Sequence, residues 1–253
     1  MLDQRLATRV ENFVSRLKRE SVCMHGFILD VRGEVKATAY YPPFVEGKAH
    51  RMYSVSKSMT VLAIGLLLDE GKISLDDRIA DYFRDFLPEK PDARLMRLKI
   101  RDMLRMATCY RATVYRETDD DWTKPFFTAE PTHEPGTVFH YDTGCSQVLA
   151  ALVARLTGQQ VMDYLTARVF TPLGANDEKH WLCDPAGTCQ GGTGLCMSLR
   201  DLHKVTRLVM DGGRGILPEW FCREMTKKHI DNCLCANEEE LSLIHISEPT
   251  RPY

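Results

Sequence analysis

The sequence predicts a mixed α/β protein of the α+β type in which helices dominate. Two observations support this prediction: apolar residues recur at helical spacing in several segments, and two β-rich runs flank a turn near the N-terminus. The chain has 253 residues and a formal net charge of -2. This length provides ample core for one large domain, and no internal repeat or linker divides the chain.

The N-terminal part alternates between the two kinds of pattern. Residues 2–19 place their apolar side chains on one stripe, as an amphipathic helix does. Residues 23–41 have two strand-like runs around "RGE", which predicts a β-hairpin. The apolar stretch 52–71 predicts a buried helix that ends at Gly71 with a left-handed cap. Ser74 is a further N-cap candidate that predicts a short helix after it.

The C-terminal part is mainly helical after a long irregular stretch. Residues 108–140 are rich in Thr, Asp, Pro and aromatic residues, and loops of this length are usually functional or disordered. Helices are predicted over 145–158 and 159–174. Residues 191–213 predict a short extended piece, followed by a helix with Ser198 as its N-cap.

The charge and apolar patterns exclude several classes of partner. A nearly neutral chain has no electrostatic reason to bind nucleic acid or an anionic membrane surface. The basic residues of 94–105 alternate with Leu, Met and Ile at helical spacing, which is typical of a solvated amphipathic face. The N-terminus has no signal-type apolar stretch, and no uncharged apolar run is long enough to span a membrane.

The cysteines indicate a reducing compartment and no metal site. There are nine, an odd number, and they are widely scattered, so we expect reduced thiols in a cytoplasmic protein. The pair Cys233 and Cys235, with His229 nearby, lacks the usual C-x-x-C spacing and a second pair of ligands. We therefore expect neither a metal nor an organic cofactor.

A candidate nucleophile precedes the most apolar helix. In "SVSK", Ser54 and Lys57 are three residues apart, which places both side chains on one helix face. A serine hydroxyl becomes a good nucleophile when a neighbouring base takes its proton, and a lysine amine can do so if burial lowers its pKa. Ser15 and Lys18 repeat the pattern on the amphipathic first helix. The pattern alone therefore leaves catalysis open against a structural N-cap serine with a solvent-reaching lysine.

A second polar group stands before another apolar helix. In "HYDTG", Tyr141 and Thr143 directly precede the helix predicted over 145–158. With "YSVSKSMT", "FTPLG" and "GGTGL", this segment resembles the serine β-lactamase and penicillin-binding protein superfamily, in particular its class C branch, which also contains esterases. The resemblance covers roughly residues 5–230.

The resemblance implies both a fold and a set of roles. The fold is an antiparallel sheet flanked by helices, with an additional helical lobe and an active site between them. Ser54 matches the nucleophile that forms an acyl-enzyme, Lys57 the lysine that activates it, and Tyr141 the tyrosine that carries protons to the leaving group. The expected partner is a small-molecule or peptide-like substrate, and no cofactor is implied.

Other residues near these motifs have less defined roles. Thr143 stands where the family often has asparagine; we assign it to substrate binding, although a hydroxyl has one donor and a shorter reach. Tyr110 and Trp122 are weaker candidates for substrate contact, with ordinary packing as the alternative. Ser56 is interpreted as packing or capping. His50 and His140 flank the two motifs and are interpreted as structural.

The third motif of the family, K-T-G or H-x-G on a strand beside the nucleophile, is expected beyond residue 240. Residues 241–251 resemble the in-frame translation of a transposase-end sequencing adapter. We therefore divide the chain into an incomplete hydrolase domain, 1–240, and a non-native tail, 241–253. The prediction is a helix-rich structure with a truncated sheet, at most three long strands and one exposed edge.

These observations predict a serine hydrolase that acts through an acyl-enzyme on an ester, amide or β-lactam-type carbonyl. Two alternatives stay open: a non-catalytic binding or sensor protein that keeps the pocket, and an inactive fragment of the enzyme. Covalent labelling of Ser54 distinguishes the first alternative from the hydrolase. The sequence indicates neither the particular substrate nor the oligomeric state.

Overall fold

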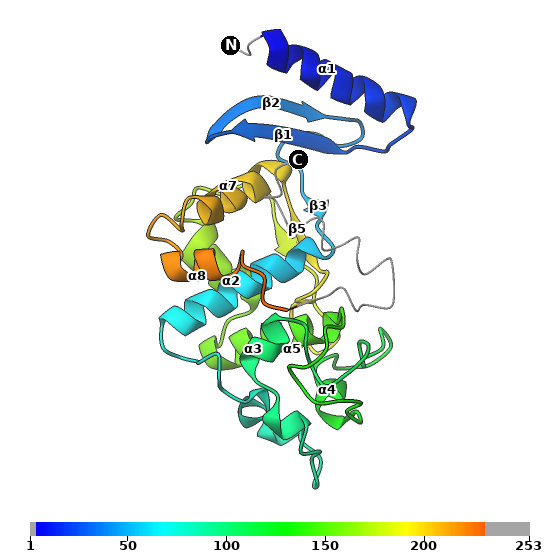
Figure 1. The fold of residues 1–253 in the computed structure, drawn as a ribbon, viewed down its shortest axis with the longest axis vertical. Helices are drawn as coiled ribbons and strands as arrows, with labels where there is room; N and C mark the ends of the chain where they lie inside the picture. The colour runs from blue at the N-terminus through cyan, green and yellow to red at the C-terminus, as the bar shows by residue number, and fades with distance from the viewer. Residues whose placement is uncertain (1–3, 231–253) are drawn as a thin grey trace.

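The computed structural model describes residues 4–230. Its elements run along the molecule in two layers, an N-terminal helix and hairpin at one end and a larger helical body at the other (Figure 1). The helices and strands are α1 (Gln4–Arg19), β1 (Gly26–Val31), β2 (Glu34–Tyr40), β3 (His50–Arg51), α2 (Val55–Asp69), α3 (Ile100–Leu104), α4 (Pro125–Thr128), α5 (Thr143–Thr157), α6 (Val161–Leu165), β4 (His180–Trp181), β5 (Leu195–Met197), α7 (Leu199–Met210) and α8 (Glu219–Glu224).

The N-terminal layer consists of α1 and the β1–β2 hairpin. The two strands are antiparallel, and the turn between them has positive φ at Arg32 and Gly33, as two-residue hairpin turns require. The apolar stripe of α1 lies over the hairpin, where Phe13 meets Phe27 edge to face at a centroid distance of 5.4 Å. The other side of the hairpin lies on α7 (Figure 1). The predicted hairpin is therefore confirmed.

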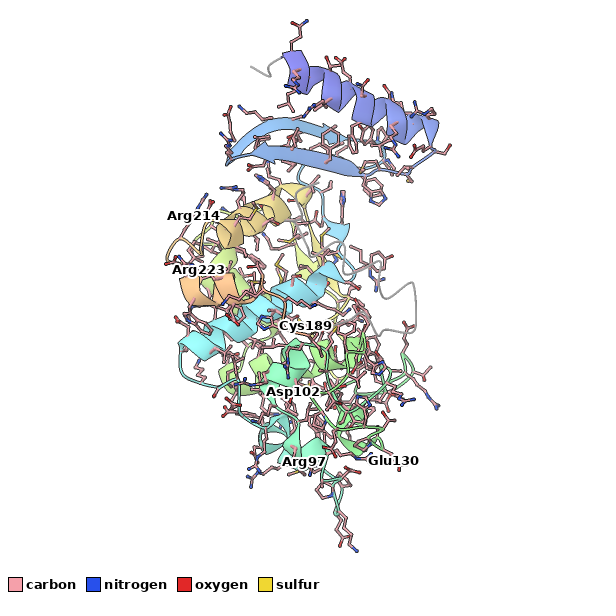
Figure 2. The ribbon with its side chains drawn as sticks, viewed as in Figure 1. Arg97, Asp102, Glu130, Cys189, Arg214 and Arg223 are labelled. Atoms are coloured by element: carbon pink, nitrogen blue, oxygen red, sulfur yellow. The ribbon has the colours of Figure 1, made fainter. Side chains whose placement is uncertain are left out.

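The core of the larger body is built around α2 and α5, which lie side by side. Both helices are apolar over most of their surface, and most of their residues are buried. Such helices are stable only when other elements cover them. For α5 these elements are α2, α3, α4 and α6. Side chains fill the space between these helices, and Arg97 and Glu130 lie in the half of the body away from the hairpin (Figure 2).

A small sheet connects the start of α2 to the start of α7. Its order is β3-β5-β4, all antiparallel, and each strand has two or three residues. The hairpin strands have six and seven residues. Within residues 4–230 there are thus two long strands, and β1 pairs only with β2. The expected truncated sheet with helix in excess is confirmed for this part of the chain.

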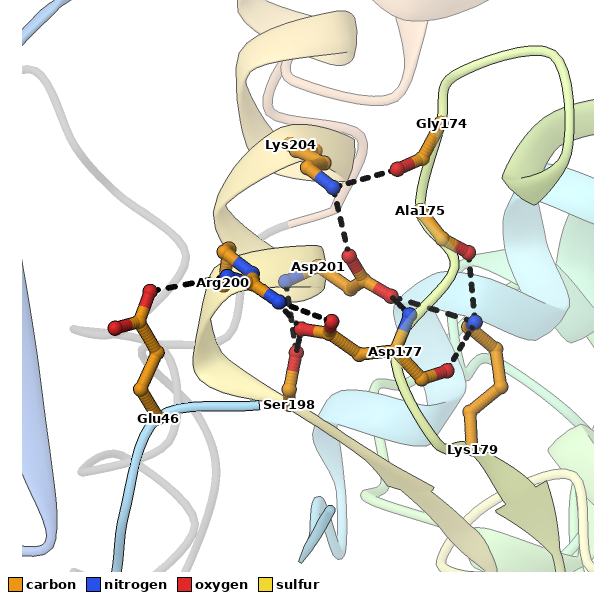
Figure 3. A network of polar contacts seen from close by, with 9 residues as sticks. All are labelled: Glu46, Gly174, Ala175, Asp177, Lys179, Ser198, Arg200, Asp201 and Lys204. Atoms are coloured by element: carbon orange, nitrogen blue, oxygen red, sulfur yellow. Dashed lines mark hydrogen bonds and ion pairs between the residues drawn. The ribbon is translucent and has the colours of Figure 1, made fainter. Parts of the chain in front are cut away.

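An ionic network around the buried Asp201 fixes the start of α7 (Figure 3). The Ser198 hydroxyl accepts the Asp201 N–H at 3.0 Å, so the predicted N-cap is confirmed. Asp201 is 0% exposed, and its carboxylate is balanced by Lys179 at 3.3 Å and Lys204 at 3.0 Å. Because Ser198 directly follows β5, this network also holds the strand that borders α2.

Two helix predictions need correction. The segment 159–174 is not one helix: α6 ends at Leu165, and a π-helical turn, Thr166–Phe170, continues it. Ser74 does cap a turn, since its hydroxyl accepts the Asp76 N–H at 3.3 Å, but the following helix is a short 3₁₀ turn, Ile79–Tyr82. The π-helical turn is wider than an α-helical turn, and the 3₁₀ turn after Ser74 is tighter. In neither place does the sequence pattern indicate this difference from the α-helix.

Candidate active site

Ser54 lies at the N-terminal end of α2, where the small sheet meets the helix. The Met52 N–H donates to the Leu195 carbonyl at 2.7 Å, which ties the chain to β5 just before the turn. Tyr53 has φ of 45°, a left-handed conformation that is uncommon for a large side chain and is often found at functional sites. Ser54 makes no capping hydrogen bond through its side chain. Its hydroxyl is therefore free of the backbone N–H groups of α2 and available to side chains.

Lys57 is one turn further along α2 and is buried, with 7% of its surface exposed. Its Nζ donates to Ser54 Oγ at 3.2 Å and to the Gly192 carbonyl at 2.9 Å. It also lies 4.8 Å from the centre of the Tyr141 ring. The alternative of a solvent-reaching lysine does not apply, because this amine is held inside the protein by three groups.

Tyr141 brings the third polar atom from a distant part of the chain. Its hydroxyl donates to Ser54 Oγ at 2.7 Å, although the two residues are 87 positions apart. The structure thus places the hydroxyl of Ser54 within hydrogen-bonding distance of both the Lys57 amine and the Tyr141 phenol. The catalytic role of the three residues stays a proposal.

The Gly191–Gly192 backbone completes the surroundings of Lys57. The Thr60 hydroxyl donates to the Gly191 carbonyl at 2.8 Å, and the Gly191 N–H donates to Gln147 at 3.2 Å. A Cβ at Gly192 would lie 2.5 Å from the Thr143 methyl group and 3.2 Å from Lys57 Nζ, so only glycine fits without displacement. The sequence indicates no role for this pair, although "GGTG" is part of the family resemblance.

Thr143 and Asp142 form the start of α5 beside Tyr141. Thr143 is half-buried, its methyl group faces Gly192, and its N–H donates to the Thr113 hydroxyl at 3.0 Å. Asp142 is the N-cap of α5 and accepts the Gly144 N–H at 2.7 Å. Thr143 is therefore at the edge of the site, whereas Asp142 is a buried neighbour that the sequence analysis missed.

The substrate-contact role of Tyr110 is contradicted. Its side chain is 1% exposed, its hydroxyl donates to the Phe126 carbonyl at 2.5 Å, and burial raises its pKa. Trp122 is also largely buried and stacks on Tyr115 with the centroids 4.8 Å apart. Both residues pack the core, because the irregular segment folds its aromatic side chains inward. Sequence cannot distinguish this from a loop that offers them to a ligand.

Three further residues have the packing roles that we expected. Ser56 is buried, and its hydroxyl accepts the Leu195 N–H at 3.1 Å, which joins α2 to β5. His50 lies 4.7 Å from the Phe44 ring, and burial lowers its pKa. His140 lies 5.4 Å from the His133 ring. Within residues 4–230, none of the three forms a hydrogen bond with Ser54, Lys57 or Tyr141.

A cavity of about 400 Å³ opens along α2 beside the site. Lys57, Ser58 and Val61 of α2 line it together with residues of α3 and α8. Ser54 and Tyr141 do not line it, so Lys57 alone of the three candidate groups borders this cavity.

Residues 4–230 contain neither a cluster of metal ligands nor a membrane-spanning helix. No group of three or more His, Cys, Asp or Glu side chains there can hold a metal ion. No helix in the same range has the length and apolar character needed to cross a membrane. Residues 232–235, the weak metal candidate of the sequence, and the tail 241–253 lie outside the described residues.

The fold and the serine–lysine–tyrosine arrangement together define a chain of the β-lactamase and penicillin-binding protein class. The family model described as Beta-lactamase matches residues 27–231, which is most of the chain. The chain belongs to the β-lactamase family.

Similar proteins agree with this assignment. The chain is 27% identical over 225 residues to a 6-aminohexanoate-dimer hydrolase of Paenarthrobacter ureafaciens, covering 82% of this chain and 57% of that protein. A putative 6-aminohexanoate-dimer hydrolase from Bacillus anthracis has a similar structure, with a TM-score of 0.72, 19% identity and coverage of 85% and 62% of the two chains. The octameric penicillin-binding protein homologue from Pyrococcus abyssi gives a TM-score of 0.71, 19% identity and coverage of 90% and 61%. The chain therefore spans about three fifths of the length of these relatives.

Proposed function

We propose that this chain carries the nucleophile, the base and the proton carrier of a serine hydrolase that acts through an acyl-enzyme. The observation that supports this most directly is the convergence of the Lys57 amine and the Tyr141 hydroxyl on Ser54 Oγ, at 3.2 and 2.7 Å. A serine is activated when a base lies within hydrogen-bonding distance of its hydroxyl in a partly buried position.

In acylation, the proton of Ser54 passes to Lys57 or Tyr141 in its unprotonated form while Ser54 Oγ bonds to the carbonyl carbon. The tetrahedral intermediate then collapses, the bond to the leaving group breaks, and the leaving group takes a proton through Tyr141. A water molecule then attacks the acyl-enzyme with the same proton transfers, and the acid is released. Lys57 and Tyr141 end each cycle in the protonation states in which they began it.

The start of α2 supports the negative oxygen of the intermediate. The N–H groups of Val55 and Ser56 donate to carbonyls of the preceding turn, so they do not face a substrate. No acceptor takes the Ser54 N–H among residues 4–230, and it is the available donor for an oxyanion at this end of the helix. A second donor is expected from the third family motif, which we place beyond residue 240.

The substrate is proposed to be a small ester, amide or β-lactam-type molecule. The name of the relative from P. ureafaciens, 6-aminohexanoate-dimer hydrolase, favours a small substrate of that kind. The Thr143 methyl group faces Gly192 beside the Lys57 amine, and this position supports our assignment of Thr143 to substrate contact. A cytoplasmic location and the division at residue 240 also stay predictions.

Covalent labelling tests the proposal. A fluorophosphonate probe should add its mass to the chain, at Ser54, and the Ser54→Ala variant should gain none. Ser15→Ala is the matched control, because Ser15 has the same S-x-x-K spacing on α1, and its labelling should equal that of the parent.

The two alternatives predict different outcomes. A version that continues with the native gene sequence after Glu240 should be compared with this chain. Labelling of the longer version alone indicates an inactive fragment. If neither version is labelled, the result contradicts the hydrolase and favours a binding or sensor protein.

A further inference from the structure

Two cysteines face each other across a short turn that has no part in the mechanism above. Cys183 and Cys189 are partners in an isolated antiparallel β-bridge, and their sulfur atoms are 4.0 Å apart. Both are free thiols; Cys183 is exposed, whereas Cys189 is 2% exposed. Among residues 4–230, no other two cysteine sulfurs lie within hydrogen-bonding distance of each other. We call residues 183–189 the cysteine turn.

The backbone of the cysteine turn has a geometry that suits a disulfide. The Asp184 N–H donates to the Thr188 carbonyl at 2.8 Å. The Gln190 N–H donates to the Leu182 carbonyl, also at 2.8 Å. These bonds lie on either side of the two cysteines, which therefore occupy a non-hydrogen-bonded pair, where Cα atoms are about 4.5 Å apart. A disulfide spans Cα separations of about 4.4–6.8 Å, so the sulfurs need to approach by about 2 Å through side-chain rotation.

The two thiols differ in access and in freedom to move. Cys189 is held by its surroundings: its N–H donates to Gln160 at 3.0 Å, and burial raises the pKa of its thiol. The chain that follows is closely packed, since a Cβ at Gly191 would lie 2.1 Å from the Ser146 carbonyl oxygen. Cys183 is exposed, so an oxidant in solution reaches this sulfur first.

The cysteine turn leads directly into the backbone that holds Lys57. The Gln147 side chain, 1% exposed, donates to Asp184 at 3.1 Å and accepts the Gly191 N–H at 3.2 Å. The next residue, Gly192, accepts the Lys57 amine at 2.9 Å. One buried amide therefore connects the turn between the cysteines to the glycine pair beside the candidate site.

We propose that Cys183 and Cys189 form an oxidisable thiol pair, in which a peroxide closes a reversible disulfide that fastens the cysteine turn and the Gly191 backbone after it. The thiolate of Cys183 attacks one oxygen of hydrogen peroxide, the O–O bond breaks, and the departing hydroxide takes the thiol proton and leaves as water. Cys183 is then a sulfenic acid. The sulfur of Cys189 attacks it, the S–O bond breaks, and the proton of Cys189 leaves with the hydroxyl group as a second water.

The step is balanced and reversible. Two thiols lose two electrons together, and one hydrogen peroxide is reduced to two waters. A small-molecule thiol restores both cysteines by thiol–disulfide exchange, which begins at the exposed sulfur of Cys183. The sequence predicts reduced thiols, and in a reducing compartment a disulfide of this kind is transient and responds to oxidants.

The disulfide is tested by mapping linkages after oxidation. The chain is treated with hydrogen peroxide, its remaining thiols are alkylated, and it is cleaved by trypsin and by a protease that cuts before aspartate. Cleavage before Asp184 separates the two cysteines, so a disulfide should join peptide 180–183 to peptide 184–200. Dithiothreitol should separate the peptides again. Cys196 lies in the second peptide and should carry the alkyl group, which assigns the linkage to Cys189.

Other products of the same experiment overturn the inference. A linkage of Cys183 to a different cysteine would show that the 4.0 Å approach does not direct the chemistry. Conversion of Cys183 to a sulfinic acid without any linkage would show that Cys189 does not reach the sulfenic acid.

The effect on the backbone is measured by hydrogen exchange of the Gly191 amide before and after oxidation. Exchange should slow by about tenfold, because a disulfide across the turn restricts its open forms. In Cys183→Ser, a substitution at an exposed position, peroxide should leave the exchange rate unchanged. Cys23→Ser is the matched control, because Cys23 is also exposed and no cysteine within residues 4–230 contacts it; oxidation should slow exchange as in the parent.

Equal exchange in the oxidised and reduced parent would overturn the proposal that the disulfide fastens the Gly191 backbone. Neither measurement uses Ser54. Absence of fluorophosphonate labelling therefore contradicts the hydrolase alone, and absence of the disulfide contradicts this inference alone.

Discussion

The chain contains the same four-residue pattern twice, at Ser15–Lys18 on α1 and at Ser54–Lys57 at the start of α2. On α1 no residue is buried, and both members of the pair are exposed. On α2 the lysine is buried, and its amine contacts the serine hydroxyl, a backbone carbonyl and an aromatic ring. The spacing is identical, so the surroundings alone make one pair a candidate for chemistry.

The difference has a physical origin in the two helices. Helix α1 is amphipathic, and its polar face remains in water, where a lysine amine stays hydrated and a serine hydroxyl has no base. Helix α2 is apolar over most of its length, so most of its residues, Lys57 among them, are buried against other parts of the protein. The fold around α2 brings Gly192 and Tyr141 to Lys57, and these contacts distinguish this pair from Ser15 and Lys18.

The largest expected effect comes from removing the two lysines one at a time. Lys57→Ala should lower the rate of labelling at Ser54 by about 10²–10⁴-fold, the usual contribution of a positioned proton-transfer group. Lys18→Ala should leave that rate within about twofold, because Lys18 is exposed on α1. The rate is measured by quenching the reaction with the fluorophosphonate probe at a series of times and determining the labelled fraction. Equal effects of the two variants would contradict the distinction between the sites.

The sequence predicted several elements and the candidate pair Ser54 and Lys57 because their signals are local. The hairpin, α2 with its glycine end and the Ser198 cap each follow from spacing or turn chemistry within a few residues. Tyr141 was found through the order of four segments in the family resemblance. These are patterns that a single sequence contains.

The remaining contacts of the site are set by the tertiary fold. Gly192 holds the Lys57 amine through a carbonyl 135 residues away, and Thr113 reaches Asp142 across 29 residues. Neither contact leaves a periodic or spacing signal. The inward orientation of Tyr110 has the same cause, because an aromatic residue in an irregular segment has no pattern that reveals which side it faces. The sequence could therefore indicate the candidate reactive residues but not the residues that support them.

A methyl group at Gly192 tests how tightly these supports fit. In Gly192→Ala the new Cβ would meet the Thr143 methyl group at 2.5 Å and Lys57 Nζ at 3.2 Å, so either α5 or the amine must move. We expect about 100-fold slower labelling, because a displacement of about 1 Å has this effect at reacting groups.

Gly158→Ala is the control for Gly192→Ala. Gly158 ends α5 with φ of 70° and has no atom within 4 Å of an added Cβ, so alanine should cost about 1 kcal/mol of unfolding free energy through backbone strain. Labelling should be unchanged in this variant. Denaturant unfolding and labelling rates measured on both variants separate a loss of stability from a loss of geometry. A rate of labelling equal to the parent in Gly192→Ala would show that the site is looser than the contacts indicate.

The smallest expected effect lies in the N-terminal layer, at the contact between the hairpin and α7. Asp30 Oδ2 lies 2.9 Å from His203 Nε2, and Asp30 Oδ1 accepts the Gly33 N–H at 2.7 Å. Burial acts to raise the pKa of Asp30, but the bonds from His203 and Gly33 and the charge of Arg207 outweigh it, so the pKa lies below its usual value. A carboxyl with a lowered pKa stabilises the folded form above its ordinary pKa, about 3.9, and this stabilisation is lost as the pH falls through the folded value.

The Asp30→Asn variant should therefore loosen the hairpin at neutral pH and resemble the parent in strong acid. Amide exchange in β1, given as the ratio of variant to parent at each pH, should rise a few-fold at pH 7 and return toward one below about pH 3. Glu34→Gln is the matched control, because Glu34 pairs with Lys36 inside the hairpin and its ion pair does not reach α7. Labelling at Ser54 should be the same in both variants, since the N-terminal layer touches the body through α7 and does not border Lys57. A change in labelling without a change in β1 exchange would mean that Asp30 acts on the site by a route other than the attachment of the hairpin.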